Sequence, residues 1–133
     1  MKTSDLRIGN LIEVDGFYYP VLWINKVGVE LKKIGWVNAK YIKPIRLYPY
    51  LLAILKGVEY KKIDEHQECY TLKLNKDVEI AYYSYYGKIT KASEVFFYYP
   101  DDKMLFYKQA APLYYHKLQN LYHELTGREL KDE

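Results

Sequence analysis

The stretch Val78-Glu79-Ile80-Ala81-Tyr82-Tyr83-Ser84-Tyr85-Tyr86 decides how the central part of this chain folds. Successive side chains of a β-strand point to opposite faces of the sheet, so the pair Tyr82-Tyr83 places one aromatic ring on each face. Seventeen of the 133 residues are tyrosine, and such pairs recur at Tyr18-Tyr19, Tyr98-Tyr99 and Tyr114-Tyr115. We therefore predict a sheet with aromatic side chains on both faces, one of which is the core.

The segments on either side of this stretch predict that the sheet is antiparallel. Apolar and polar residues alternate over residues 70–74, as in a half-buried strand, and in the next strand Val95, Phe97 and Tyr99 alternate with Phe96 and Tyr98. Pro100 to Lys103 predicts a turn, and Met104 to Lys108 a last short strand. With Val78, Ile80 and Tyr82 facing the core, the face away from the core carries Tyr83, Tyr85, Phe96 and Tyr98, and Tyr107 is a further candidate. These residues are the first candidate binding surface.

Residues 1–47 predict a separate small β-domain. Asp15-Gly16 is a hairpin signal between strands at 10–14 and 17–24. Short strands at 29–33, 35–38 and 41–42 complete a set of five, which favours an SH3-like small β-barrel. Residues 48–133 then form the second domain, with a short helix at 49–56 and an antiparallel sheet packed against a C-terminal helix. The chain as a whole is therefore expected to be α+β.

The C-terminal helix is expected to run from Pro112 to Thr126 and to end at Gly127. His116, Gln119 and Asn120 lie on its polar side, where lysine and glutamate would be better helix formers. One interpretation is a hydrogen-bonding strip for a partner or ligand. The alternative is that these side chains tie the helix to the rest of the protein and satisfy buried backbone groups.

Charge, cysteine content and hydrophobic stretches indicate whether the protein binds nucleic acid, forms disulfides or enters a membrane. The formal charge is +3, and residues 1–47 hold eight Lys/Arg against four Asp/Glu. This surplus is too mild to indicate a dedicated nucleic-acid binder. The single cysteine, Cys69, has no partner for an internal disulfide, and no stretch has the length of a signal peptide or a membrane span. We expect a cytoplasmic protein that does not enter the membrane.

The sequence offers little catalytic chemistry. It has no glycine-rich phosphate loop and no Gly-x-Ser-x-Gly elbow. The densest group of potential ligands is Asp64 to Cys69. His66, Glu68 and His116 would be the acid–base groups if the protein were a small hydrolase, but a charged turn is usually just solvated. We therefore predict no enzyme, no catalytic residue, no metal and no cofactor.

Three segments resemble a known family. They are Leu6-Arg7-Ile8-Gly9-Asn10, then Lys43-Pro44-Ile45 with the short helix after it, and finally Tyr115-His116-Lys117-Leu118-Gln119-Asn120-Leu121-Tyr122 with Leu125-Thr126-Gly127-Arg128-Glu129-Leu130. In this the chain resembles small uncharacterised proteins encoded by phages and prophages of gut Bacteroidales. The tyrosine-rich residues 82–99 and Pro20 depart from that pattern. The resemblance implies an origin and a shared scaffold, and it brings no catalytic residue with it.

Together these features predict a phage or prophage accessory protein that binds a host or phage protein, and countering bacterial immunity would fit that origin. The expected contact surface combines Trp23, Trp36 and Tyr41 with the outward tyrosines, because tyrosine and tryptophan give large contact area with a polar tip. The runner-up is nucleic-acid or nucleotide binding through stacked tyrosines and Lys32, Lys33 and Lys40. For the aromatic face taken by itself, the interpretation that needs the fewest assumptions, and that we place first, is that the N-terminal domain or a second copy of the chain covers it.

Overall fold

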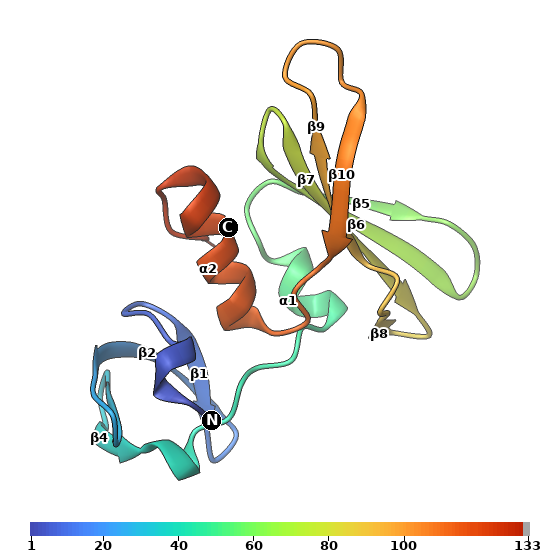
Figure 1. Ribbon diagram of the computed structural model, residues 1–133. Coiled ribbons are helices and arrows are strands. Elements are labelled where there is room, and N and C mark those ends of the chain that lie inside the picture. Colours follow the sequence, from blue (N-terminus) through green and yellow to red (C-terminus); the bar gives the residue numbers. More distant parts are fainter. Residues whose placement is uncertain (132–133) are drawn as a thin grey trace. The chain divides into compact units, whose positions relative to one another are not determined.

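The computed structural model describes residues 1–131 and contains two compact units. Unit 1 comprises Met1–Arg46 and Tyr114–Asn120, and unit 2 comprises Leu47–Leu113 and the chain from Leu121 onward. Figure 1 shows both, with the strands of unit 1 in blue and those of unit 2 in green to orange. The described residues are mixed α and β, with antiparallel sheets and a C-terminal helix, as predicted.

Unit 1 is built on a four-stranded antiparallel sheet in the order β1-β2-β3-β4. Its elements are η1 (Thr3–Asp5), β1 (Leu11–Val14), β2 (Phe17–Ile24), β3 (Gly28–Leu31), β4 (Gly35–Asn38) and η2 (Ala39–Tyr41). The predicted hairpin turn is confirmed, because Asp15 and Gly16 both have positive φ, at 52° and 82°. The core of the unit consists of Ile12, Val21, Val29, Leu31 and Ile42.

The predicted fifth strand of unit 1 at residues 41–42 is wrong. The Asn38 side chain accepts a hydrogen bond from the Lys40 amide and turns the chain into the 3-10 helix η2 instead. After this turn, Lys43 forms an isolated antiparallel bridge with Glu13 of β1. Within residues 1–131 no pairing of β4 with β1 closes the sheet into a barrel.

Unit 2 contains a six-stranded antiparallel sheet. Its elements are α1 (Pro49–Ala53), β5 (Val58–Lys62), β6 (Gln67–Asn75), β7 (Val78–Tyr85), β8 (Lys88–Ile89), β9 (Glu94–Tyr98) and β10 (Leu105–Ala110). The strand order is β10-β9-β7-β6-β5, and β8 pairs with the end of β7. The short, strongly charged strand β5 and the two-residue strand β8 were not predicted.

Both helices are shorter than the sequence predicts. Helix α1 ends at Ala53 rather than Lys56, because the Leu55 amide bonds to the Leu52 carbonyl and tightens the last turn. Helix α2 (Tyr115–Thr126) begins three residues after Pro112, because residue 114 bridges to Arg46 and the Tyr115 amide bonds to the Ile45 carbonyl. It ends as predicted, at Gly127 with φ 71°.

The inner face of the unit 2 sheet forms the core of that unit. Leu72, Ile80, Tyr82 and Val95 on this face are almost completely buried, and α1 contacts β5 and β6. The Tyr82 hydroxyl donates to the Pro112 carbonyl at 2.8 Å, which satisfies its one polar group. The other face of this sheet carries the candidate site.

Candidate functional site

The strand register brings the four predicted residues of unit 2 onto one face. Phe96 of β9 lies opposite Glu79 of β7, so the alternation of side chains places Tyr83 and Tyr85 on the same side as Phe96 and Tyr98. Tyr82, one residue away, is buried on the other side. The prediction that these four residues share the face opposite Tyr82 is confirmed. We call this side the outer face; it is made by Lys73, Glu79, Ala81, Tyr83, Tyr85, Glu94, Phe96 and Tyr98.

The aromatic rings of the outer face are partly covered by one another. Tyr83, Phe96 and Tyr98 are half-buried, and Tyr85 is 46% exposed. The Phe96 and Tyr98 rings stack with their centroids 6.5 Å apart. The small side chain of Ala81 is buried between its larger neighbours on the strand. Phe96 and Tyr98 thus form a stacked pair, and with Tyr83 and Tyr85 on the same face they make the aromatic surface of unit 2.

Tyr107 does not belong to the outer face. A register shift between Leu105 and Tyr107 places Tyr107 opposite Phe97, whose side chain points to the inner side. The Tyr107 ring lies 5.6 Å from that of Phe97 and is 53% exposed. The period of two predicts the faces of the β9 side chains correctly. The bulge in β10 shifts the register by one residue and so moves Tyr107 to the opposite face from the one predicted.

Burial raises the pKa of two phenols on the outer face. The Tyr98 hydroxyl donates to Glu79 Oε1 at 2.9 Å, and partial burial together with this bond raises the pKa of Tyr98. Burial also raises the pKa of Tyr83, with smaller effects of Cys69, Glu94 and Glu79. Tyr83 and Tyr98 therefore offer neutral hydroxyl groups and aromatic rings over the physiological pH range.

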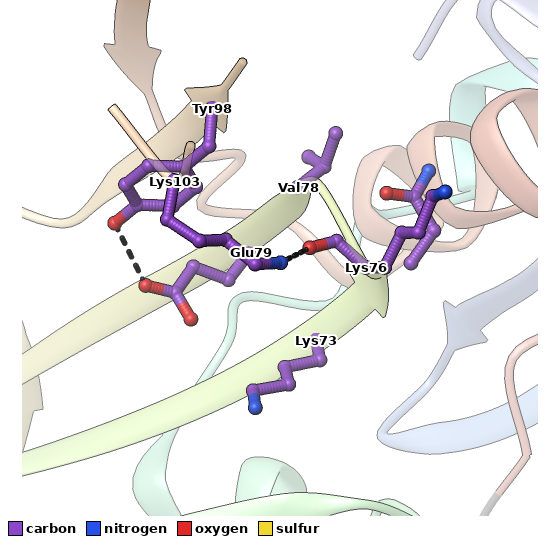
Figure 2. A pocket seen from close by; sticks show the side chains of 7 residues that line it. Lys73, Lys76, Val78, Glu79, Tyr98 and Lys103 are labelled. Carbon is purple, nitrogen blue, oxygen red and sulfur yellow. Dashed lines mark hydrogen bonds between the residues drawn. The ribbon is translucent and has the colours of Figure 1, made fainter. Parts of the chain in front are cut away.

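Two hollows flank the aromatic surface. One, of about 410 Å³, is lined by Tyr98 and Glu79 and by Lys73, Asn75, Lys76, Val78 and Lys103. Figure 2 shows this pocket, with Tyr98 bonded to Glu79 and the Lys103 ammonium donating to the Lys76 carbonyl. The other, of about 460 Å³, is lined by Ile63, Gln67, Glu68, Tyr83, Ser84, Tyr85, Thr90, Ala92 and Glu94. Lys76 and Lys103 were not predicted as site residues, because in sequence they look like solvated turn lysines.

The predicted residues of unit 1 form a second exposed aromatic surface. In the register, Trp23 of β2 lies opposite Glu30 of β3, and Glu30 lies opposite Trp36 of β4. This row faces away from the core residue Val29, and Trp23 and Trp36 are 57% and 53% exposed. We call it the tryptophan row. Tyr41 is 59% exposed in η2, with the Lys40 ammonium 5.1 Å from its ring centre.

Gln119 and Asn120 make their hydrogen bonds inside unit 1. Gln119 Oε1 accepts from the Leu11 amide at 2.8 Å, and its side-chain nitrogen donates to the Gly9 carbonyl at 3.3 Å. Asn120 Oδ1 accepts from Asn10 Nδ2 at 2.7 Å and from Arg7 Nε at 3.3 Å. Arg7, Asn10, Gln119 and Asn120 form what we call the polar network. It corresponds to the alternative in which these amides hold the helix in place, so we leave them out of the binding surface.

His116 is also an interior residue of unit 1. It is 2% exposed, and both of its ring nitrogens are buried with no hydrogen-bond partner among residues 1–131. Burial lowers the pKa of this imidazole, the neighbouring Lys117 lowers it further, and Asp5 opposes the change. His116 therefore stays neutral at pH 7 and has no access to a partner.

The side chains from Asp64 to Cys69 interact with nearby backbone amides and tyrosines. Asp64 Oδ1 accepts from the amides of His66 and Gln67, and the His66 ring stacks on Tyr86 with centroids 4.3 Å apart. Glu68 accepts hydrogen bonds from the hydroxyls of Tyr60 and Tyr70, both at 3.0 Å. Among residues 1–131 no group of three or more His, Cys, Asp and Glu is arranged to hold a metal ion.

Comparison with known proteins adds no further residue to the site. No protein-family model, no curated protein and no solved structure matches the chain. In the part of the chain that the structure describes, no helix has the length and apolar character needed to span a membrane.

Proposed function

We propose that this protein acts without catalysis, by binding a protein partner through the tryptophan row of unit 1 and the outer face of unit 2. Its resemblance to phage and prophage proteins supports a role as an accessory protein that binds a host or phage protein in the bacterial cytoplasm. Interference with bacterial immunity is one such role. The exposed aromatic surfaces support binding, and the resemblance to phage and prophage proteins indicates the kind of partner.

The observation that carries the proposal is the exposure of Trp23 and Trp36. Both are more than half exposed on one face of a sheet whose other face is the core of the unit. Tryptophan is among the residues that contribute most to protein–protein binding energy, since burial of its large ring removes much apolar surface from water. Glu30 between the two rings supplies a charged acceptor that would fix the orientation of a partner.

A capture experiment with tagged protein tests this function. Partner capture from host lysate should survive nuclease treatment and elevated salt, because an apolar contact responds little to ionic strength. Trp23→Ala with Trp36→Ala should abolish capture, whereas Ile8→Ala, which removes another exposed apolar side chain (49% exposed), should not. Equal capture by the double variant and the wild-type protein would remove the tryptophan row from the proposal.

A second candidate function, single-stranded nucleic-acid binding by unit 1, has its own supporting observation. A groove of about 330 Å³ in unit 1 is lined by Phe17, Tyr18, Tyr19 and Pro20 together with Lys32 and Lys33. Aromatic rings beside lysines suit stacked bases and their phosphates, at about 1–3 kcal/mol per stacked base. Affinity of this kind should fall steeply with added salt, and Lys32→Gln should reduce the salt dependence.

We further propose that unit 1 is an SH3-like barrel. The 3-10 helix η2 after β4 and the Glu13–Lys43 bridge, with backbone bonds of 2.9 Å in both directions, support it, because they bring the chain after β4 back to β1. We also propose that the unit 2 sheet packs against the end of α2. The bond of 3.0 Å from the Lys56 amide to the Lys131 carbonyl, which holds the chain after α2 beside that before β5, supports this packing.

A further inference from the structure

A basic corner of unit 2 contains two cavities that share one lysine. Lys73 lines the pocket of about 410 Å³ beside Tyr98 and also a second cavity of about 540 Å³. The second cavity is formed by the α1–β5 loop, by Tyr122 of α2 and by the chain that follows this helix. Lys73 therefore stands between two adjoining spaces, each within the size range of small-molecule sites.

Positive charge dominates the lining of the two cavities. Six basic side chains face them, Lys56, Lys73, Lys76, Lys103, Arg128 and Lys131, against the two acids Glu79 and Glu129. Within residues 1–131 none of these six cations forms an ion pair, although Lys73 lies opposite Glu79 in the register. Glu79 instead accepts the hydroxyl of Tyr98. Asp77, Asp101 and Asp102 are close in sequence but line neither cavity.

Local hydrogen bonds hold the backbone that presents these cations. The Lys56 amide bonds to the Lys131 carbonyl at 3.0 Å, and the Arg128 amide bonds to Thr126 Oγ1 at 3.0 Å. Lys103 donates to the Lys76 carbonyl, which brings the β9–β10 turn to the β6–β7 turn, as Figure 2 shows. The charge is thus concentrated on ordered turns around Lys73 of strand β6. The whole of residues 48–133, in contrast, holds twelve Lys/Arg against thirteen Asp/Glu.

The chemistry of the lining selects the class of ligand. Lysine ammonium groups are compact charges that bind phosphate oxygens, and Asn75 adds amide donors. Cations distributed over two cavities around Lys73 suit a ligand with several negative groups in a row rather than a single anion. The Tyr98 ring at the edge of the first cavity offers a surface on which a base could stack.

We propose that the basic corner around Lys73 binds a compact ligand with two or more phosphate groups, whose anionic groups extend across both cavities. The ligand would neutralise cations that now repel one another. The site needs no protein partner and is separate from the tryptophan row, although its first cavity shares Lys73, Glu79 and Tyr98 with the outer face. Nucleoside polyphosphates and inorganic polyphosphate share the required chemistry.

Calorimetric titration of the full chain with inorganic tripolyphosphate and with ATP tests the site. Lys73→Gln should weaken binding of both probes about tenfold or more, the loss expected for one charge-assisted contact. Lys76→Gln, in the first cavity only, and Arg128→Gln, in the second only, should each weaken binding as well. Lys91→Gln removes an equally exposed lysine that lines neither cavity and should change affinity less than about twofold.

The source of the phosphate groups follows from a comparison of the two probes. If ATP binds more tightly than tripolyphosphate, and Tyr98→Leu removes only this difference in affinity, the ligand is a nucleoside polyphosphate. Equal affinities for the two probes indicate an inorganic polyphosphate. Equal losses for Lys73→Gln and Lys91→Gln would reduce the effect to general surface charge and overturn the proposal. If only one of Lys76→Gln and Arg128→Gln weakened binding, the ligand would occupy a single cavity, and the proposal that it extends across both would be overturned. Binding of a single-stranded oligonucleotide without binding of either probe would also overturn it, in favour of nucleic acid.

Discussion

The polar network of unit 1 and the outer face of unit 2 both contain residues that the sequence offers as candidates for binding. In the structure, the side chains of the network bond to one another, whereas the rings of the outer face stay partly exposed. Asn10 is completely buried and bonds to Arg7, Gln119 and Asn120. The outer-face rings remain partly exposed, and among residues 1–131 Tyr98 is the only one of its four aromatic residues whose side chain forms a hydrogen bond, to Glu79. Polar side chains that satisfy each other hold a fold together, whereas exposed rings remain available for contact.

The polar network joins two segments that lie far apart in the sequence, residues 6–10 and 115–122. A buried amide network admits few substitutes, because each lost partner leaves a buried polar group unsatisfied. Both segments are among those on which the proposed phage origin is based, whereas the outer face lies in the tyrosine-rich region that departs from that pattern.

The largest expected effect comes from breaking the network at Asn10. Asn10→Ala removes the acceptor of the Arg7 amide and the donor to Asn120, both at 2.7 Å, and should lower the free energy of unfolding by about 3 kcal/mol. Tyr85→Ser on the outer face of unit 2 should cost about 0.5 kcal/mol or less, measured by urea unfolding followed by far-ultraviolet circular dichroism. Both tryptophans of the chain lie in unit 1, so denaturant unfolding followed by tryptophan fluorescence reports on that unit. An unchanged midpoint for Asn10→Ala would contradict the structural role of the network.

A smaller effect should separate the two faces of one strand. Tyr82→Phe removes the hydroxyl that donates to the buried carbonyl of Pro112 and should cost about 1–2 kcal/mol. The same change at the adjacent Tyr83, on the outer face, should be nearly neutral, because within residues 1–131 its hydroxyl forms no hydrogen bond. Far-ultraviolet circular dichroism during urea unfolding measures both variants. Equal losses at both positions would mean that the outer face is as tightly packed as the core.

The strands and their faces were largely readable from the sequence, because the period of two along β7 and β9 matches their burial. Tyr83, Tyr85, Phe96 and Tyr98 were therefore placed correctly on one face. The assignment failed where local hydrogen bonds override the pattern. The Asn38 cap replaced a strand with η2, and the bulge in β10 moved Tyr107 to the other face.

The candidate sites were harder to predict than the fold. The polarity of Gln119 and Asn120 left two interpretations open, and only the distances to residues 5–11 decide between them. The basic corner is invisible in the sequence, since its six cations come from strand β6, which carries Lys73, and from four turns and loops spread over residues 56–131. The net charge of residues 48–133 does not reveal this corner, because all the acidic residues at positions 48–131 except Glu79 and Glu129 lie outside the two cavities.

A pH effect of intermediate size should come from His116. Its lowered pKa means that the unfolded chain binds a proton more readily than the folded one, so unit 1 should lose stability as the pH falls below about 6.5. His116→Leu should make unit 1 less sensitive to acid without loss of stability at pH 7, because the imidazole nitrogens have no partners to lose. Tryptophan-detected unfolding between pH 7 and pH 5 measures this, with His66→Leu as the exposed control. An unchanged acid dependence in His116→Leu would show that other groups control it.

The smallest and most local effect concerns the inner-face residue Tyr70. Its partial burial, with a bond to Glu68, raises the pKa of Tyr70 to about 12. Because this value lies above the unfolded value of about 10, the corresponding stability is intact below pH 10 and is lost as the pH rises toward 12. Glu68→Gln should lower the pKa of Tyr70 only in part, since burial is the larger cause and remains. Phenolate absorbance during alkaline titration, with Tyr70→Phe to assign the signal, measures the change. If Glu68→Gln brought Tyr70 to the ordinary value, the carboxylate rather than burial would control this hydroxyl, and inner-face and outer-face tyrosines would then differ less than their exposure suggests.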